Sequence, residues 1–291
     1  MHSVIKTMLA KYQCRSGQDY INALKEIFQE IALLGLWRSK FYEKAAFYGG
    51  TALRILYGLD RFSEDLDFTL LKPDNHFDLS TYNQAIADEL NSFGFKVTVE
   101  TKKKTIESNI ESAFIKATTK KQLIIIEAES EMINRIHHMD TIKIKMEIDT
   151  NPPGSVDTEV RHVLLPIPFS VKTLTQSDLF AGKIHAVLCR PWQTRVKGRD
   201  WYDLVWYVSR NIPVNLSHLH DRLIQSKAWE KNKKFTPNDL VELLKNKINQ
   251  TDFNNAKADI LPFIKDKRAI ELWSRDFFLH IIEKINADNA V

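Results

Sequence analysis

The sequence predicts an α/β (α+β) protein: a mixed sheet with flanking helices, followed by an all-helical C-terminal part. Segments that alternate polar and apolar residues, as half-buried strands do, lie before about residue 165. After that point the apolar residues recur at helical spacing. A chain of 291 residues is long enough for two domains. We expect the first domain to span residues 1–165 and the second 166–291.

The composition is typical of a soluble globular protein, with 44% hydrophobic and 27% charged residues. No run approaches the roughly 18 apolar residues that a membrane span needs, and the N-terminus lacks the apolar centre of a secretory signal. Cys14 and Cys189 are far apart, which indicates neither a disulfide framework nor a zinc site. We therefore expect a cytoplasmic protein with no membrane partner.

The elements can be predicted in chain order. Residues 18–36 form an amphipathic helix, because their apolar side chains recur every three to four positions. A Gly49-Gly50 turn then opens a short helix over residues 51–59. Further strands are expected over 63–71, 95–101, 112–118, 122–129 and 142–150, and a further helix over 79–94. The C-terminal helices are expected over 175–189, 198–210, 217–229 and 237–248, with a helical pattern ending near Ile285.

Two aspartates make the segment after the first turn unusual. Asp65 and Asp67 are two residues apart in a predicted strand, so both carboxylates project from one face. Like charges in such positions repel each other unless a cation lies between them, and Mg²⁺ prefers oxygen ligands that it shares with substrate phosphates. The Gly49-Gly50-Thr51 turn can receive a phosphate on its backbone N–H groups. The alternative is a glycine turn beside two exposed aspartates at a strand end.

A third carboxylate can come from the strand over residues 142–150. Glu147 and Asp149 lie on one face of it, and in a two-metal site such a group holds one metal and helps to deprotonate the attacking hydroxyl. We slightly favour Asp149, because the end of a strand is nearer a cleft. The alternative is a solvated strand face on which Lys143 and Lys145 pair with the two acids.

The second half of the chain is basic. Residues 172–234 contain twelve Lys/Arg and five Asp/Glu, a balance of +7, which fits either nucleic-acid binding or a solvated helical surface. Lys183 borders an apolar helical band, where it either extends along the surface to solvent or reaches a triphosphate. Asp200 and Asp203 share one face of a predicted helix. Asp200 follows Arg199 at the helix start, where an acid can also simply complement the dipole.

These blocks together resemble a known family. The chain contains GGTAL at 49–53, RFSEDLDF at 61–68, KMEIDTNPP at 145–153, a helical Lys183 and RDWYDL at 199–204. In this order they resemble the AbiEii/AbiGii abortive-infection toxin family over about residues 18–210. Its members are proteins of the nucleotidyltransferase fold that belong to type IV toxin–antitoxin systems.

The resemblance implies roles for individual residues. Gly49, Gly50 and Ser63 would contact nucleotide phosphates, and the paired aspartates would hold Mg²⁺, or Mn²⁺ in its place. The full set of expected catalytic residues is Asp65, Asp67, Asp149, Lys183 and Asp200. The expected nucleotide-binding residues are Gly49, Gly50, Thr51, Arg61, Ser63, Arg199 and Asp203, and the expected metal ligands are Asp65, Asp67, Asp149 and Glu147.

The resemblance also implies a function. We expect a toxin-like nucleotidyltransferase that moves NMP from an NTP to an RNA acceptor, with the tRNA 3′ end as the expected target. Such a reaction would inhibit growth or phage propagation, and an antitoxin encoded next to the gene is an expected partner. Two alternatives remain: the acceptor is a protein hydroxyl of a target or antitoxin, or the chain is a non-catalytic RNA-binding protein of the same fold.

Overall fold

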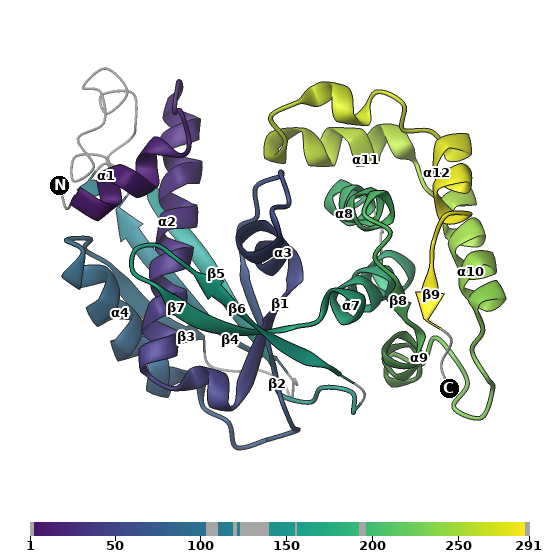
Figure 1. Ribbon diagram of the computed structural model, residues 1–291, viewed down its shortest axis with the longest axis horizontal. Coiled ribbons are helices and arrows are strands. Elements are labelled where there is room, and N and C mark those ends of the chain that lie inside the picture. Colours follow the sequence, from purple (N-terminus) through teal and green to yellow (C-terminus); the bar gives the residue numbers. More distant parts are fainter. Residues whose placement is uncertain are drawn as a thin grey trace. The chain divides into compact units, whose positions relative to one another are not determined.

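The computed structural model describes residues 3–102, 110–118, 121–122, 140–154, 156–191 and 196–288. The chain divides into two compact units (Figure 1). The first unit contains Met1–Gly58, Phe62–Pro152 and Glu159–Thr173, and the second contains Leu59–Arg61, Pro153–Thr158 and Leu174–Val291. Residue 165, where the sequence predicts a domain boundary, lies between two strands of the first unit. The two-domain division with that boundary stays a prediction.

The first unit is built on a mixed sheet, which in the described residues has seven strands in the order β3-β4-β5-β2-β1-β7-β6. Strand β2 pairs antiparallel with β1 and parallel with β5. The α/β class is therefore confirmed. The strands are β1 (Ala45–Tyr48), β2 (Leu66–Leu70), β3 (Thr98–Lys102), β4 (Ile110–Thr118), β5 (Thr141–Asp149), β6 (Thr158–Val163) and β7 (Phe169–Leu174).

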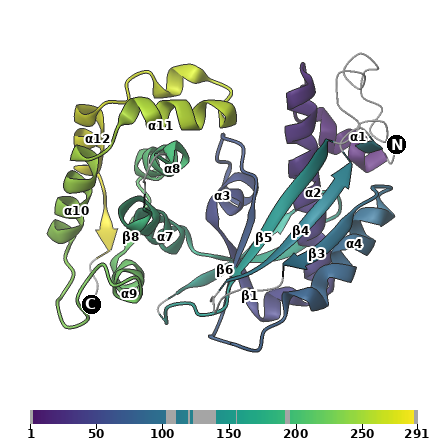
Figure 2. The same cartoon turned by 180° about the vertical axis from the view of Figure 1, so that it is seen from behind.

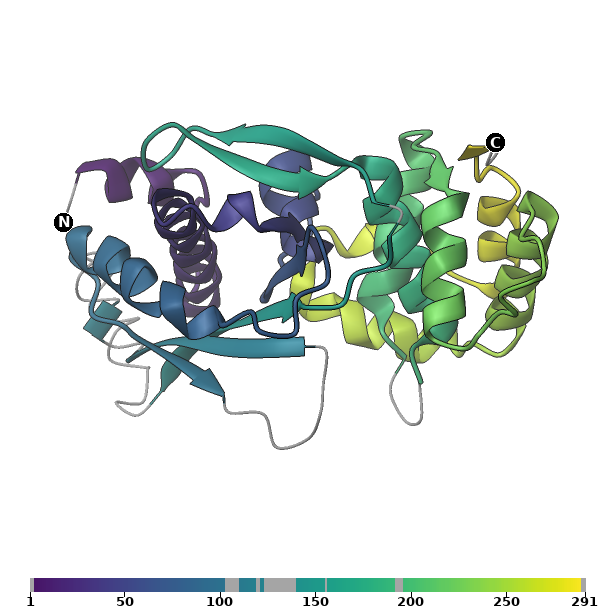
Figure 3. The ribbon, with the colours of Figure 1, turned by 90° about the horizontal axis from the view of Figure 1, so that it is seen from below.

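Helices α1 (Ser3–Ala10), α2 (Gly17–Arg38), α3 (Gly49–Tyr57) and α4 (Asn83–Ser92) flank this sheet, together with the 3-10 turns η1 (Phe41–Glu43) and η2 (Leu79–Tyr82). Helix α2 confirms the helix predicted over 18–36: Leu24, Ile27 and Ile31 on its apolar face are fully buried. It packs beside α4 (Figure 3), and α4 lies next to β3 (Figure 2). The predicted strand over 142–150 is also confirmed as β5, in which buried and more exposed residues alternate.

Strands β1, β6 and β7 are absent from the sequence-based prediction. Strand β7 pairs parallel with β1, where Phe47 lies opposite Thr173, and the Thr173 hydroxyl donates to the Phe47 carbonyl at 2.8 Å. The segment alternates buried Phe169 and Val171 with polar neighbours, but Pro166 and Pro168 just before it are typical of a loop. The predicted strand over 122–129 lies, beyond Gln122, outside the described residues.

The second unit is mainly helical. Its core is aromatic: the Trp201 ring lies 5.2 Å from Phe253 and 4.9 Å from Phe278 between centroids. The elements are α7 (Gln176–Cys189), α8 (Gly198–Ser209), α9 (Leu216–Gln225), α10 (Pro237–Asn249), α11 (Phe253–Ile260), η3 (Leu261–Phe263), η4 (Lys267–Ile270) and α12 (Arg275–Ile282), with short strands β8 (Val214–Asn215) and β9 (Ala287–Asp288). Each predicted C-terminal helix corresponds to one of these, and the last helical pattern consists of several short pieces. Across the described ranges, no helix has both the length and the apolarity to cross a bilayer.

Candidate active site

The paired aspartates lie at the centre of the sheet of the first unit. Asp67 is the second residue of β2, and Asp65 directly precedes this strand. The strand register places Asp67 between Tyr48 of β1 and Glu147 of β5. Paired residues of neighbouring strands point to the same face of a sheet, so Asp67 and Glu147 are neighbours on one face.

Gly49 allows the carboxylate of Asp67 to approach the start of α3. This glycine has a φ of +81°, and a Cβ at its position would collide with Oδ2 of Asp67. A residue with a side chain is therefore disfavoured here both by backbone strain and by lack of space. The N-terminus of a helix carries partial positive charge. The turn thus combines an anion-attracting helix end with an acidic side chain.

The segment that leads to the aspartates is held from two helices. The Thr51 hydroxyl of α3 donates to the backbone carbonyl of Asp65. The Gln29 amide of α2 donates to the carbonyl of Ser63 at 3.1 Å and to that of Glu64 at 2.9 Å. Gln29 is fully buried. These contacts fix the backbone on which Ser63 and Asp65 are carried.

Sequence reasoning missed Gln29. The available signal was a glutamine among the apolar positions of the predicted amphipathic helix, directly after Phe28 and two residues before Ile31. A buried amide in such a position needs hydrogen-bond partners, and here they are carbonyls of a functional loop.

The two candidates for a third carboxylate differ in register. Glu147 lies opposite Asp67, whereas Asp149 lies opposite Thr69, two positions further along β2. Oε1 of Glu147 is 2.6 Å from Nζ of Lys145, so the expected ion pair on the strand face exists. Oδ1 of Asp149 accepts a hydrogen bond from the backbone N–H of Asn151 at 3.0 Å. Glu147 is therefore the nearer neighbour of Asp67 along the sheet.

The donor set of this site suits a hard cation. Asp65 and Asp67 offer carboxylate oxygens, and Mg²⁺ is usually bound by one or two carboxylates together with substrate phosphates and water. Within the described ranges, no group of three or more His, Cys, Asp or Glu side chains is arranged to hold a metal ion.

Four predicted residues, Arg61, Lys183, Asp200 and Asp203, meet in the second unit, and together with the half-exposed Arg190 they are here called the buried ion cluster. Arg61 contacts Asp203 with both Nε and Nη2, each at 2.6 Å. Lys183 lies 3.0 Å from Asp200 and 2.8 Å from Asp203. Arg190, which the sequence did not single out, donates to Asp200 at 2.9 Å.

In this cluster, burial and ion pairing shift the pKa values of the side chains in opposite directions. Burial would raise the pKa of Asp203, but the charges of Arg61 and Lys183 outweigh it, so the pKa lies below its ordinary value. Burial would lower the pKa of Lys183, but Asp203 and Asp200 outweigh it, so the pKa is raised. The Arg61 side chain is only 2% exposed and Asp203 is 0% exposed. Arg61 and Asp203 are therefore both charged, because each stabilises the ionised form of the other.

The predicted site residues thus form two groups. The first unit holds Gly49, Gly50, Thr51, Ser63, Asp65, Asp67, Glu147 and Asp149, and the second unit holds Arg61, Lys183, Asp200 and Asp203. Arg199, also of the second unit, lies with its guanidinium 4.3 Å above the ring of Phe263.

A mixed sheet that carries two aspartates beside a glycine turn is the arrangement expected for the nucleotidyltransferase class. Comparison with family models identifies the family. The model described as "Nucleotidyl transferase AbiEii toxin, Type IV TA system" matches residues 31–280, which is most of the chain. The protein belongs to this AbiEii nucleotidyltransferase toxin family. The resemblance seen in the sequence is confirmed at this level.

Two solved structures from Helicobacter pylori are similar to the chain. One is a candidate nucleotidyltransferase with 17% identity and a TM-score of 0.42, covering 88% of each chain. The other is JHP933, with 17% identity and a TM-score of 0.45, covering 90% of this chain and 88% of its own. No curated protein matches the sequence.

Proposed function

We propose that this protein transfers NMP from an NTP to an RNA hydroxyl in a metal-dependent reaction, with the tRNA 3′ end as the expected acceptor. The observation that carries the proposal is the packing of the Asp67 carboxylate against the Gly49 turn. In this packing, the carboxylate that we assign to the metal lies beside backbone of the kind that binds phosphate. Membership of a nucleotidyltransferase family supports the same chemistry.

In the proposed reaction, the acceptor oxygen bonds to the α-phosphorus while the bond to the pyrophosphate oxygen breaks. Asp65 and Asp67 would hold Mg²⁺, or Mn²⁺, which when bound to the triphosphate neutralises its negative charge. The N–H groups of the Gly49-Gly50-Thr51 turn, together with Ser63, bind phosphate oxygens. Pyrophosphate is released.

A carboxylate accepts the proton of the attacking hydroxyl. Glu147 and Asp149 remain the two candidates for this base. The register favours Glu147, because it is the residue opposite Asp67. Replacement of each by its amide distinguishes them: the variant that loses transfer while keeping NTP binding identifies the base.

The buried ion cluster is proposed to be required for activity. The family's required lysine and aspartate correspond to Lys183 and to Asp200 or Asp203, and Lys183 is the cation we assign to phosphate charge. Arg61 and Asp203 are buried against each other. This burial supports a role in holding α8 and the 59–61 segment in place. A nucleotide contact by Arg199 or Arg61 would depend on that placement.

Family membership also supports a toxin role. Type IV toxin–antitoxin membership implies an antitoxin partner. We propose that NMP transfer blocks the acceptor and so inhibits growth or phage propagation. Growth arrest on expression, relieved by the adjacent gene, is the expected biological result.

The test is incubation of the purified protein with Mg²⁺ and each α-labelled NTP in turn, in the presence of total tRNA or cell lysate. Label in an RNA band for the wild type, but not for Asp65→Ala, supports the proposal and identifies the NTP. Label in a protein band would replace the RNA acceptor by a protein hydroxyl. Equal labelling by Asp65→Ala would refute the metal assignment.

A further inference from the structure

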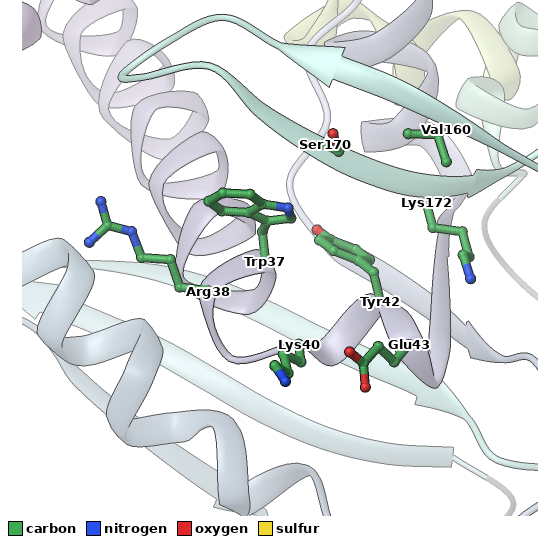
Figure 4. A pocket seen from close by; sticks show the side chains of 8 residues that line it. All are labelled: Trp37, Arg38, Lys40, Tyr42, Glu43, Val160, Ser170 and Lys172. Carbon is green, nitrogen blue, oxygen red and sulfur yellow. The ribbon is translucent and has the colours of Figure 1, made fainter.

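The first unit has a pocket of about 590 Å³ around Trp37, distinct from the carboxylate pair (Figure 4). This volume lies within the range of small-ligand pockets, roughly 300–1,000 Å³. Its walls come from the C-terminal end of α2, from η1 and the residue before it, and from β6 and β7. The lining residues are Trp37, Arg38, Lys40, Tyr42, Glu43, Val160, Ser170 and Lys172.

The pocket is positively charged. Arg38, Lys40 and Lys172 line it, against one acid, Glu43. Among the residues that the structure describes, Lys40 and Lys172 take part in no ion pair. Arg38 lies 3.3 Å from Glu89 but its side chain is 53% exposed. Lys40 and Lys172 are therefore available to an anionic ligand, while Arg38 is paired with Glu89 and still half-exposed.

An aromatic surface lies among these cations. The Trp37 side chain is 41% exposed although Trp is among the residues that gain most from burial. In Figure 4 the indole lies at the centre of the pocket, with Arg38 to one side and Lys172 to the other. A flat ring flanked by cations is the combination with which proteins hold single-stranded nucleic acid, the ring stacking on a base and the cations contacting phosphates.

The pocket and the carboxylate pair are connected through α2. Gln29 of this helix holds the segment before Asp65, and Trp37 follows eight residues later. At 1.5 Å per residue this is about 12 Å along the helix. A stacked single strand rises about 3.4 Å per nucleotide, so a few nucleotides cover that distance.

We propose that this pocket binds a single-stranded segment of the RNA acceptor, with a base on Trp37 and phosphates on Lys40, Lys172 and Arg38. The inference rests on the proposed function, and it assigns the place where the acceptor is held away from its reacting hydroxyl. An acidic polypeptide would use the cations but has no chemical need for the exposed ring. The combination of both features favours nucleic acid.

The test is fluorescence anisotropy with a labelled single-stranded RNA of about 12 nucleotides, measured without NTP over a salt series. Trp37→Ala should weaken binding about tenfold, and Trp37→Phe, which keeps a ring, should recover most of it. The double variant Lys40→Ala/Lys172→Ala should make the slope of log binding constant against log salt concentration shallower by about 1.4. Each lost phosphate contact accounts for about 0.7 of this change.

The matched control is Lys267→Ala/Lys284→Ala, which removes two exposed charges from the second unit and should leave the slope nearly unchanged. Circular dichroism checks that each variant is folded, and the lysine pair, being exposed or half-exposed, tests the proposal independently of Trp37. Unchanged RNA affinity and slope in the pocket variants would overturn the inference. So would an absence of RNA binding by the wild type, or pocket-dependent binding of poly-glutamate but not RNA.

The outcomes separate this inference from the proposed function. Asp67→Asn should abolish NMP transfer and retain the affinity for the labelled RNA. Pocket-dependent RNA binding without any transfer by the wild type would contradict the proposed function alone. Transfer with normal acceptor KM in the pocket variants would contradict the inference alone.

Discussion

Gly49 decides the local geometry of the proposed active site, because it combines a positive φ with the absence of a side chain. Gly58, at the other end of α3, also has a positive φ of +76°, but a Cβ there would meet nothing within 4 Å. A comparison of the two positions therefore distinguishes the cost of backbone strain, which applies to both, from the cost of steric collision, which applies only to Gly49.

Gly58→Ala should lower the free energy of unfolding by about 1–2 kcal/mol, the cost of the left-handed backbone for a residue with a Cβ. Gly49→Ala should lower it by about 1–3 kcal/mol more, since the methyl group displaces the Asp67 carboxylate. Urea denaturation of both variants gives the difference. Equal stabilities would show that the close approach to Asp67 has no energetic consequence.

Glu30 is a buried residue for which the structure predicts an effect of pH on stability. Burial raises its pKa from the ordinary 4.5 to about 7, with Glu26 adding to the shift and Lys11 and Arg54 opposing it. Since the folded state binds this proton more tightly than the unfolded state, the free energy of unfolding falls as pH rises from about 4.5 to about 7. At about 1.4 kcal/mol per pKa unit the loss is roughly 3 kcal/mol.

Glu30→Gln should remove this slope, so that the difference in stability between wild type and variant changes across that pH range. Denaturant titrations at a series of pH values measure it. Asp88→Asn, at an exposed position of α4, is the control and should keep the wild-type slope. An unchanged slope in Glu30→Gln would contradict the prediction.

At the level of elements, α2 does more than cover the sheet. Its Gln29 anchors the backbone of Ser63 and Glu64 from one side. The neighbouring ion pair between Arg54 and Glu26, at 2.9 Å, joins α2 to α3. Helix α2 thus orders both the turn and the segment that carry the site.

Gln29→Leu should lower the free energy of unfolding by about 1–3 kcal/mol, because two buried carbonyls lose their donor. It should also reduce kcat for NMP transfer at least roughly tenfold through misplacement of Asp65. Gln18→Leu, at an exposed position on the same helix, is the control and should change neither. A loss of stability without a kcat change would leave Gln29 as a purely structural residue.

The buried ion cluster ties the start of α8 to α7 and to the segment around Arg61. Asp203→Ala should destabilise the protein by about 3–5 kcal/mol, since it leaves the buried Arg61 charge without its bidentate partner. Asp266→Ala is the matched control, because its pair with Arg268 is exposed and should change the stability far less. Similar stabilities of the two variants would show that the cluster is not essential for folding.

At the scale of the whole molecule, local sequence patterns predicted individual helices and strands far better than they predicted which strands pair over long distances. The alternation of 142–150 was sufficient, because β5 has one buried face that sequence spacing reveals. The apolar spacing of 18–36 also predicted its helix, although α2 is buried on all sides from Glu26 to Leu36. The seven-stranded order and the position of β7 beside β1 depend on contacts between distant residues, which spacing does not encode. The described residues therefore show a larger sheet than the sequence predicted.

The same limit applies to the candidate site. The chemistry of Asp65 and Asp67 and their glycine turn is visible in the sequence, since all of these residues lie in one short segment. The register that places Glu147 rather than Asp149 opposite Asp67 depends on the pairing of β2 with β5. Arg61, which the sequence placed near the nucleotide, belongs by its contacts to the second unit and pairs with Asp203.

The central claim is that the carboxylate pair beside the Gly49 turn binds an NTP through a divalent cation. Isothermal titration calorimetry with each NTP, with Mg²⁺ and with EDTA, tests it for the wild type and Asp67→Asn, which keeps the shape of the side chain. We predict binding that requires Mg²⁺ and that is at least about tenfold weaker in the variant. NTP binding of equal affinity in EDTA and in Asp67→Asn would contradict the account.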